Sequence, residues 1–247
     1  MYSGLTADEI IIAGHGGDEI NAYFARPHGE GPFPGVVVIH HMPGWDESTT
    51  EIANRFAAHD SLAVVPNLHH RDAPSASPDD AAAASRAAGG VPDDRLIGDV
   101  AGAVAFLRAL PESNGKVGVI GYCSGGRQAF LVACSIDVDA AVDCYGAFVV
   151  GTPPEGMGMK VQPILHLAEN LQCPLLGLFG LDDQFPTPEQ VDELEAELKR
   201  LGKDYEFHRY EGAGHAFFNT ARDSYRAGAA ADGWQRIFAF YARHLAG

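Results

Sequence analysis

The hydrophobic residues of this chain follow two alternating patterns. Short runs rich in aliphatic and β-branched residues predict six strands, at residues 36–40, 62–66, 117–122, 140–145, 175–180 and 205–210. Stretches with a helical spacing of apolar residues lie between them and predict helices at residues 49–59, 93–110, 125–134, 188–201 and 227–245. Because strands and helices alternate and most of the strands are apolar throughout, we expect parallel βαβ units whose strands are buried on both faces.

Two further apolar segments precede these units. Residues 9–12 and 20–25 flank the turn sequence His15-Gly16-Gly17-Asp18 and predict an antiparallel hairpin at the edge of the sheet. No repeat and no linker divides the sequence. The pattern therefore predicts a single α/β domain over residues 1–247, with three layers, a mostly parallel twisted sheet, an N-terminal antiparallel hairpin and helices on both faces.

Two stretches do not fit the alternation of strands and helices. Residues 67–92 begin with several turn-forming residues and continue into an alanine-rich run at 81–88, which predicts one exposed helix. Residues 146–164 are rich in glycine and proline and predict a long loop. Each stretch is either part of a functional site or a surface insertion, because long loops in compact domains serve both purposes.

Composition and charge narrow the class of protein. The 247 residues are 46% hydrophobic, which provides a packed core and argues against intrinsic disorder. Thirty-three acidic and 17 basic residues give a net charge of −16, which opposes binding to nucleic acids and anionic membranes. No apolar run is long enough to span a membrane, and the first residues do not have the pattern of a signal peptide. We therefore expect a cytoplasmic monomer or homodimer whose partner is a small molecule.

One of the four cysteines lies in a motif that indicates chemistry. Gly121-Tyr122-Cys123-Ser124-Gly125-Gly126 joins a predicted strand to a predicted helix, as the Gly-x-Ser-x-Gly turn of a nucleophile elbow does, with cysteine in the central position. Such a turn places the thiol at the positive end of the helix, where a thiolate is stabilised. Cys123 is therefore the expected nucleophile. The remaining cysteines lack this context and are expected to be buried and structural: Cys134, Cys144 and Cys173.

A carboxylate and a histidine follow the last two predicted strands. Asp182 and Asp183 lie directly after the strand at 175–180, and His215 follows the strand at 205–210. The carboxyl ends of parallel strands meet at one edge of a sheet, so Cys123, one of the two aspartates and His215 are expected to converge there. A thiol nucleophile uses a histidine base that a carboxylate orients. Spacing alone leaves the choice between Asp182 and Asp183 open.

These motifs resemble those of the dienelactone hydrolase (carboxymethylenebutenolidase) family of α/β-hydrolases. The resemblance covers roughly residues 10–245 and is most specific at Gly121 to Gly126, Gly180 to Asp183 and Gly214 to Phe217. It implies an α/β-hydrolase fold and assigns the orienting carboxylate to Asp183. The segment Pro66-Asn67-Leu68 with Arg71 resembles the family's Pro-Asp-Leu-x-x-Arg, in which the arginine helps to hold a substrate carboxylate.

The resemblance implies hydrolysis of a lactone or an activated ester through a thioester on Cys123, without a metal or a cofactor. The oxyanion of the intermediate needs two backbone N–H groups, which we expect from Ser124 and Met42. His215, oriented by Asp183, then activates the water that cleaves the thioester.

The sequence departs from the family at two positions. His41 stands where the best-known members have a glutamate that takes the thiol proton, and it is expected to have a related role or to line the pocket. Asn219 stands where dienelactone-specific members have an arginine, so neutral or larger esters, such as aryl esters and phosphotriesters, become candidate substrates. Aromatic residues form either the apolar wall of the pocket or part of the core: Phe148, Phe185, Phe217 and Phe218.

Two alternative functions remain at this point. The pairs His40-His41 and His69-His70 end neighbouring predicted strands, and clustered imidazoles could bind zinc in a metal-assisted hydrolase. A catalytically silent relative of the same fold that binds a small ligand is the second alternative. Because all three triad positions are filled, we expect the cysteine hydrolase.

Overall fold

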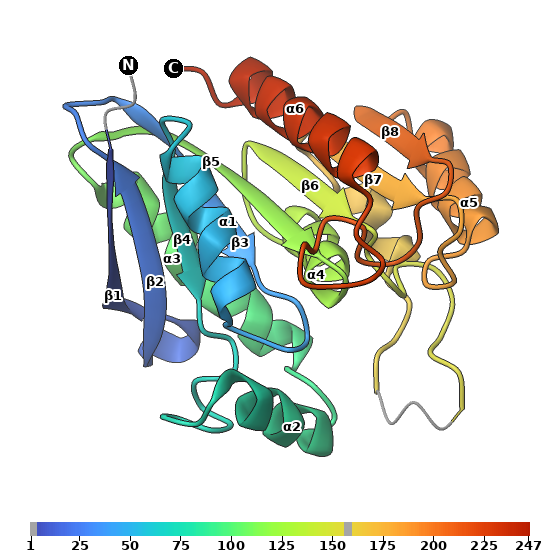
Figure 1. The fold of residues 1–247 in the computed structure, drawn as a ribbon, viewed down its shortest axis with the longest axis horizontal. Coiled ribbons are helices and arrows are strands. Elements are labelled where there is room, and N and C mark those ends of the chain that lie inside the picture. The colour runs from blue at the N-terminus through green and yellow to red at the C-terminus, as the bar shows by residue number, and fades with distance from the viewer. Residues whose placement is uncertain (1–3, 156–159) are drawn as a thin grey trace.

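The eight strands found in the described residues belong to one sheet, with the order β1-β2-β4-β3-β5-β6-β7-β8. The computed structural model describes residues 4–155 and 160–247. The strands β1 and β2 form an antiparallel hairpin, β2 pairs antiparallel with β4, and the other neighbours are parallel (Figure 1). The bounds are β1 Leu5–Ala13, β2 Glu19–Pro27, β3 Phe33–Ile39, β4 Leu62–Pro66, β5 Ser113–Tyr122, β6 Ala140–Cys144, β7 Leu175–Gly180 and β8 Tyr205–Tyr210.

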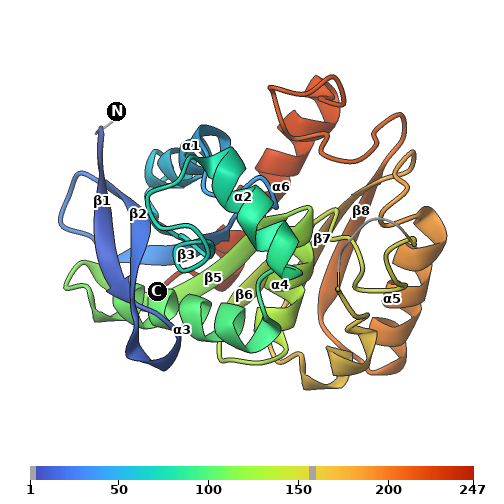
Figure 2. The same cartoon turned by 90° about the horizontal axis from the view of Figure 1, so that it is seen from below.

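Helices cover both faces of this sheet and bury a separate hydrophobic core on each. Helices α1 and α6 pack on one face, and α3, α4 and α5 lie on the other (Figure 2). The strands of the centre are buried throughout, which explains their continuous apolar sequences. The bounds are α1 Glu47–Ala57, α2 Pro78–Ala88, α3 Asp93–Ala109, α4 Ser124–Ala133, α5 Pro188–Arg200 and α6 Ala227–His244, with short 3-10 helices at His15–Gly17 and Leu165–Asn170.

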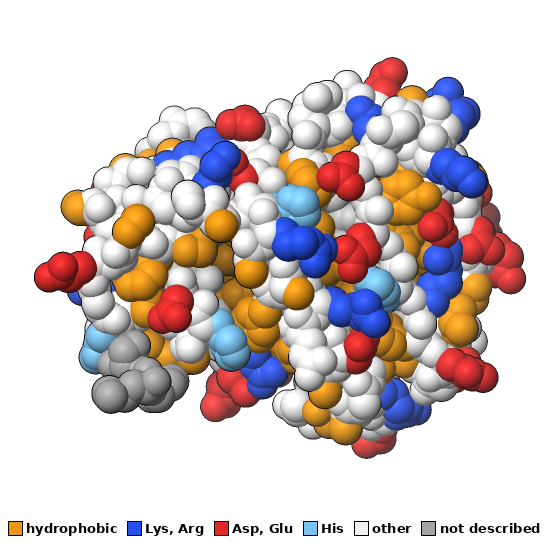
Figure 3. Space-filling view, turned by 90° about the horizontal axis from the view of Figure 1, so that it is seen from above, with side chains coloured by type: hydrophobic (Ala, Val, Ile, Leu, Met, Phe, Trp, Pro, Cys, Tyr) orange, Lys and Arg blue, Asp and Glu red, His pale blue; other side chains and the backbone are white. Residues whose placement is uncertain are grey.

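The predicted three-layer α/β architecture with an N-terminal antiparallel hairpin is confirmed. Three of the strands begin well before their predicted start, because β1 begins at Leu5, β3 at Phe33 and β5 at Ser113. No helix of the described residues is both long and apolar enough to cross a membrane. On the face shown in Figure 3, acidic and basic side chains are intermixed, with hydrophobic groups between them.

The two stretches outside the alternation differ from each other. The alanine-rich run forms α2, which Ser77 caps through its side chain, and one face of this helix is buried rather than exposed. The predicted loop at 146–164 contains no helix or strand in its described part, while its residues 156–159 lie outside the described residues. Figure 1 shows α2 and this loop at the same end of the molecule, and both contribute residues to the cavity described below.

Candidate active site

Cys123 lies on the sharp turn between β5 and α4 that the sequence predicts. Its φ of 59° and ψ of −122° are unusual for a residue with a side chain. A Cβ added to Gly121 would collide with the carbonyl oxygen of Gly125, and one added to Gly125 would collide with that of Ile39. Both glycines are therefore needed for the turn to approach the neighbouring backbone this closely.

The environment of Cys123 sets it apart from the other three cysteines. Its side chain is half-buried and lies at the N-terminal end of α4, where the helix dipole favours a thiolate. Burial raises the pKa of the Cys134 and Cys173 thiols to about 12, and that of the Cys144 thiol well above its usual value. These three thiols are buried and protonated at neutral pH, as the sequence predicts for structural cysteines.

A histidine and an aspartate meet next to this turn. The Nδ1 of His215 donates a hydrogen bond of 2.9 Å to Oδ2 of Asp183, whose other oxygen accepts the N–H of Phe185 at 2.9 Å. Asp183 is buried, whereas Asp182 is exposed, so the geometry agrees with the choice implied by the resemblance. Both oxygens of Asp183 are thereby fixed, and the orientation of the His215 ring follows from them.

The pKa of His215 depends on its two neighbours. Burial lowers this pKa, but the hydrogen bonds with Asp183 and Cys123 and the negative charges of both groups outweigh burial and raise it to about 10. At neutral pH the ring is therefore an imidazolium. Tyr145, which the sequence analysis did not single out, packs against this ring at 5.2 Å between centroids. No sequence motif marks this tyrosine.

Met42 and Ser124 lie where the sequence predicts oxyanion donors. Both line the same cavity as Cys123 and His215. Ser124 is the first residue of α4, and Met42 lies on the loop after β3. Within residues 4–155 and 160–247, neither of their backbone N–H groups donates a hydrogen bond, so both remain available to a ligand.

The cavity around these groups has a volume of about 1000 Å³. It extends from Cys123 past Phe148 and Phe185 to the end of α2 and the residues that precede α3. These two phenylalanines lie 5.6 Å apart and form part of an apolar wall, as one of the sequence interpretations has it. A space of this size accommodates a substrate with a bulky apolar part.

Phe217 does not form part of the pocket wall, contrary to the prediction that it contacts substrate. Its side chain is fully buried and lines neither the large cavity nor the small one described below. The ring packs between Tyr145, Tyr210 and Phe218, at centroid distances of 5.3, 5.1 and 4.7 Å. Phe217 is therefore a core residue, and the turn after His215 is stabilised by its burial.

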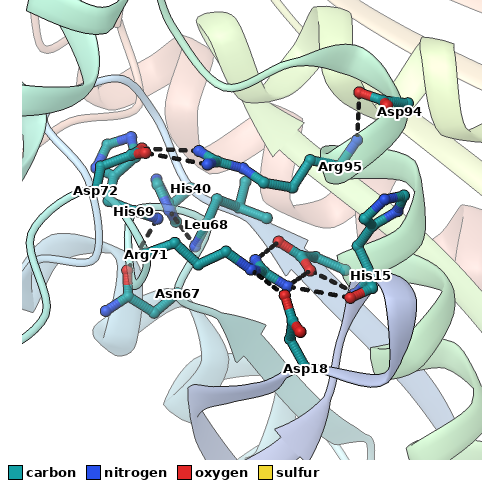
Figure 4. Close-up of polar contacts among 11 residues, drawn as sticks. His15, Asp18, His40, Asn67, Leu68, His69, Arg71, Asp72, Asp94 and Arg95 are labelled. Atoms are coloured by element: carbon teal, nitrogen blue, oxygen red, sulfur yellow. Dashed lines mark hydrogen bonds and ion pairs between the residues drawn. The ribbon is translucent and has the colours of Figure 1, made fainter.

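The paired histidines at the strand ends do not assemble a metal site. His40 donates from Nδ1 to the His41 carbonyl oxygen at 2.8 Å and accepts the Leu68 N–H at Nε2 over 3.2 Å (Figure 4). Burial, reinforced by the neighbouring His69, lowers the pKa of His40 to about 3, and burial lowers that of His69 to about 4. Both rings are therefore neutral. No group of three or more metal-binding side chains occurs in the described part of the chain.

His41 is held by an acidic residue that the sequence analysis did not consider. Its Nε2 forms a hydrogen bond of 2.7 Å with Oδ2 of Asp46. The other carboxylate oxygen of Asp46 accepts the N–H of Thr49 at 2.9 Å and caps α1. Burial opposes ionisation of Asp46, but these partners, His41 foremost, lower its pKa to about 2. The spacing of Asp46 and Thr49 is an N-cap signal, which could have located this residue.

Arg71 lies away from the cavity, contrary to the expectation that it holds a substrate carboxylate. Its guanidinium binds both oxygens of Asp99 at 2.9 and 3.0 Å, and its Nε donates to Asp18 at 2.8 Å. Figure 4 shows Arg71 directed at Asp18 and the backbone of His15. Asp99 is fully buried on α3, so the arginine neutralises an interior charge.

Replacement of Arg71 by alanine is expected to lower the free energy of unfolding by about 3 kcal/mol, because it leaves the Asp99 carboxylate buried without a partner. Urea denaturation measures this loss. Arg26→Ala is the control, because its ion pair with Glu112 joins a largely exposed arginine over 3.5 Å and is worth less than about 1 kcal/mol. Unchanged stability together with a raised KM for an anionic ester would show that Arg71 binds substrate.

Comparisons with known proteins identify the family of this chain. The Dienelactone hydrolase family matches residues 20–245. The carboxymethylenebutenolidase of Pseudomonas putida is 31% identical over 243 residues, which cover 96% of this chain and 97% of the relative. A Klebsiella pneumoniae protein, assigned to the dienelactone hydrolases, has a crystal structure that superposes with a TM-score of 0.85 at 28% identity, over 97% and 99% of the two chains.

A more distant structure has the same fold. The dienelactone hydrolase-like promiscuous phosphotriesterase P91, from metagenomic libraries, superposes with a TM-score of 0.74 at 24% identity, over 98% of this chain and 99% of that one. The family match covers most of the chain, and the relative from Pseudomonas putida matches over nearly its whole length. The protein therefore belongs to the dienelactone hydrolase family and has its α/β-hydrolase fold.

Proposed function

We propose that the protein hydrolyses lactones or activated carboxylic esters with Cys123 as nucleophile, His215 as acid and base, and Asp183 as the group that orients His215. The observation that carries this proposal is the hydrogen bond between His215 and Asp183 beside a thiol on a nucleophile elbow, in one cavity. No cofactor is needed for this chemistry, because thiolate, imidazolium and backbone N–H groups supply every proton and charge.

Acylation begins from the ion pair between the Cys123 thiolate and the His215 imidazolium. The sulfur attacks the carbonyl carbon, a C–S bond forms, and the electron pair of the carbonyl moves to its oxygen. The N–H groups of Met42 and Ser124 donate hydrogen bonds to this oxyanion, and each such donor is worth about 10²- to 10³-fold in rate. The intermediate collapses when the C–O bond to the leaving group breaks and His215 gives that oxygen its proton.

Deacylation uses the change that acylation makes in the pKa of His215. The thioester sulfur carries no negative charge, so the hydrogen bond and the charge that Cys123 contributes to the raised pKa of His215 are both lost, and only those of Asp183 remain. The neutral imidazole then takes a proton from water, and the resulting hydroxide attacks the thioester carbonyl. Cleavage of the C–S bond releases the carboxylic acid and restores the thiolate beside the imidazolium.

Neither position that matches the family's anchors for a substrate carboxylate supplies a free cation here, so neutral esters are the first class to test, although Arg86, Arg127 and Lys160 line the large cavity. Arg71 is bound to two carboxylates, and Asn219 stands in place of a second arginine. The name of the P91 relative points to phosphotriesters, which are neutral and have a good leaving group, as a further class to test.

An activated aryl ester, a neutral lactone and a phosphotriester are expected to show turnover that disappears when the thiol of Cys123 is alkylated with iodoacetamide. Only this cysteine is half-buried, while the other three are buried, so labelling is selective. Peptide mapping verifies the site of labelling, and Cys173→Ala is the control that keeps both activity and labelling. Turnover that is indifferent to alkylation of Cys123 would refute the proposal, and no turnover of any ester would favour a silent ligand-binding protein.

A further inference from the structure

Two cavities of very different size meet at Cys123. One is the large cavity of about 1000 Å³, and the other has a volume of about 60 Å³. Cys123 and His41 line both of them. The side chain of His41, fixed by Asp46, thus contributes to the walls on both sides of the thiol. A substrate bound covalently to this sulfur has access to both spaces.

The positions of the other groups determine which part of an ester enters which cavity. In the tetrahedral intermediate the reacting carbon carries four substituents, which are the sulfur, the oxyanion, the leaving-group oxygen and the acyl chain. The oxyanion faces the N–H groups of Met42 and Ser124, and the leaving-group oxygen faces His215. All three of these residues line the large cavity and none of them lines the small one. The remaining substituent, the acyl chain, is therefore directed at the small cavity.

The water of deacylation does not need the small cavity. It is activated by His215, which lines the large cavity, and it attacks from the direction in which the leaving group departed. The large cavity is open to a new molecule at that moment, because the alcohol has left. The small cavity is thus free to hold the acyl chain through both halves of the reaction.

Aromatic rings on one side of the small cavity limit the length of that chain, while polar side chains form part of the remaining lining, among them Ser48, Glu51 and Arg55. Tyr122, Phe218 and Trp234 form its inner side, and Phe218 packs edge-on against the other two rings at 5.6 and 5.8 Å between centroids. Tyr122 and Phe218 are buried, so they have little space into which to move. A volume of about 60 Å³ holds roughly four water molecules. A short acyl chain occupies a similar volume.

We propose that, among open-chain esters, the enzyme prefers those of short carboxylic acids, with an acyl chain of about two to four carbons in the small cavity and a bulky, apolar alcohol or phenol in the large one. This inference rests on the proposed function, because it assigns the two sides of the same thioester. The large cavity suits an apolar leaving group, since Leu68, Val91 and Phe148 line it.

A series of aryl esters with one leaving group and increasing acyl length tests the proposal. For acetate, butanoate, hexanoate and octanoate, kcat/KM is expected to fall by about 10-fold or more between butanoate and hexanoate, because one or two methylene groups no longer fit. Ile52 lies on α1 and lines the small cavity, so Ile52→Ala enlarges that cavity. This variant is expected to raise kcat/KM for hexanoate relative to acetate. Thr220 is exposed and lines the same cavity, so Thr220→Leu narrows the small cavity. This variant is expected to lower kcat/KM for butanoate relative to acetate.

Val91→Ala is the matched control, because it changes the large cavity and leaves the dependence on acyl length as it is. Turnover of hexanoate and octanoate as fast as acetate would overturn the inference, and so would a dependence on acyl length that neither Ile52→Ala nor Thr220→Leu alters. Because Thr220 is exposed, its variant tests the inference even when Ile52→Ala fails to fold. Thiol-dependent turnover without a length limit rejects this inference alone, whereas absence of thiol-dependent turnover of every ester rejects the proposed function.

Discussion

Replacement of Cys123 by alanine is expected to lower kcat for an activated ester by about 10⁴- to 10⁶-fold, because the atom that forms the covalent intermediate is removed. Cys123→Ser is expected to lose most of the activity as well. The hydrogen bond with Cys123 and its negative charge contribute to the raised pKa of His215, whereas a serine hydroxyl keeps its proton and supplies no such charge. Steady-state kinetics with protein of verified folding measures both losses.

The control for these variants is Cys134→Ala, which removes a buried thiol at the opposite end of the same helix without touching either cavity. It is expected to keep kcat within a small factor of the unmodified enzyme. A Cys123→Ser variant as active as the unmodified enzyme would contradict the role of the thiolate. Full activity in Cys123→Ala would exclude covalent catalysis at this position.

Replacement of Asp183 by asparagine is expected to lower kcat by about 10⁴-fold, by analogy with other triads in which the orienting carboxylate becomes an amide. The amide cannot both accept the Phe185 N–H and hold the His215 ring with its proton on Nδ1. The pKa of His215 also falls, because one of the two charges that raise it is gone. Histidine NMR signals followed against pH measure that shift alongside the kinetics.

Asp182→Asn is the matched control for this variant. Asp182 is the adjacent residue and is exposed, so its substitution is expected to leave both kcat and the pKa of His215 nearly unchanged. Equal losses in the two variants would indicate a general effect of the loop after β7 rather than orientation of His215.

The fold and the position of the thiol could be predicted from the sequence, because local signals determine them. Apolar strands predict a sheet buried on both faces, and the glycines around Cys123 predict a turn that only glycine permits. The strand ends then bring Cys123, either Asp182 or Asp183, and His215 to one edge, and the family resemblance implies Asp183.

The side-chain directions of other residues could not be predicted, since distant partners decide them. Arg71 follows a family motif, yet Asp99 on α3 and Asp18 after the first strand bind its guanidinium. His41 pairs with Asp46 only because α1 begins at that point of the loop. The local sequence around Arg71 does not determine which distant carboxylates its guanidinium binds.

The size of the two cavities likewise cannot be predicted from the sequence. The small cavity is bounded by residues from α1, β5, the turn after His215 and α6, which are far apart along the chain. The buried face of α2 and the loop after β6 complete the large cavity. Their packing, rather than any motif, determines which esters fit.

The covalent thioester on Cys123 is the central claim, and mass spectrometry of the protein quenched in acid during turnover of an aryl acetate tests it most directly. We predict that the peptide containing Cys123 gains the mass of one acetyl group. This adduct is expected to appear before the steady state, to disappear when the substrate is exhausted, and to be absent from Cys123→Ala. Steady turnover without any adduct on this peptide, or with the acetyl group on another residue, would contradict the account.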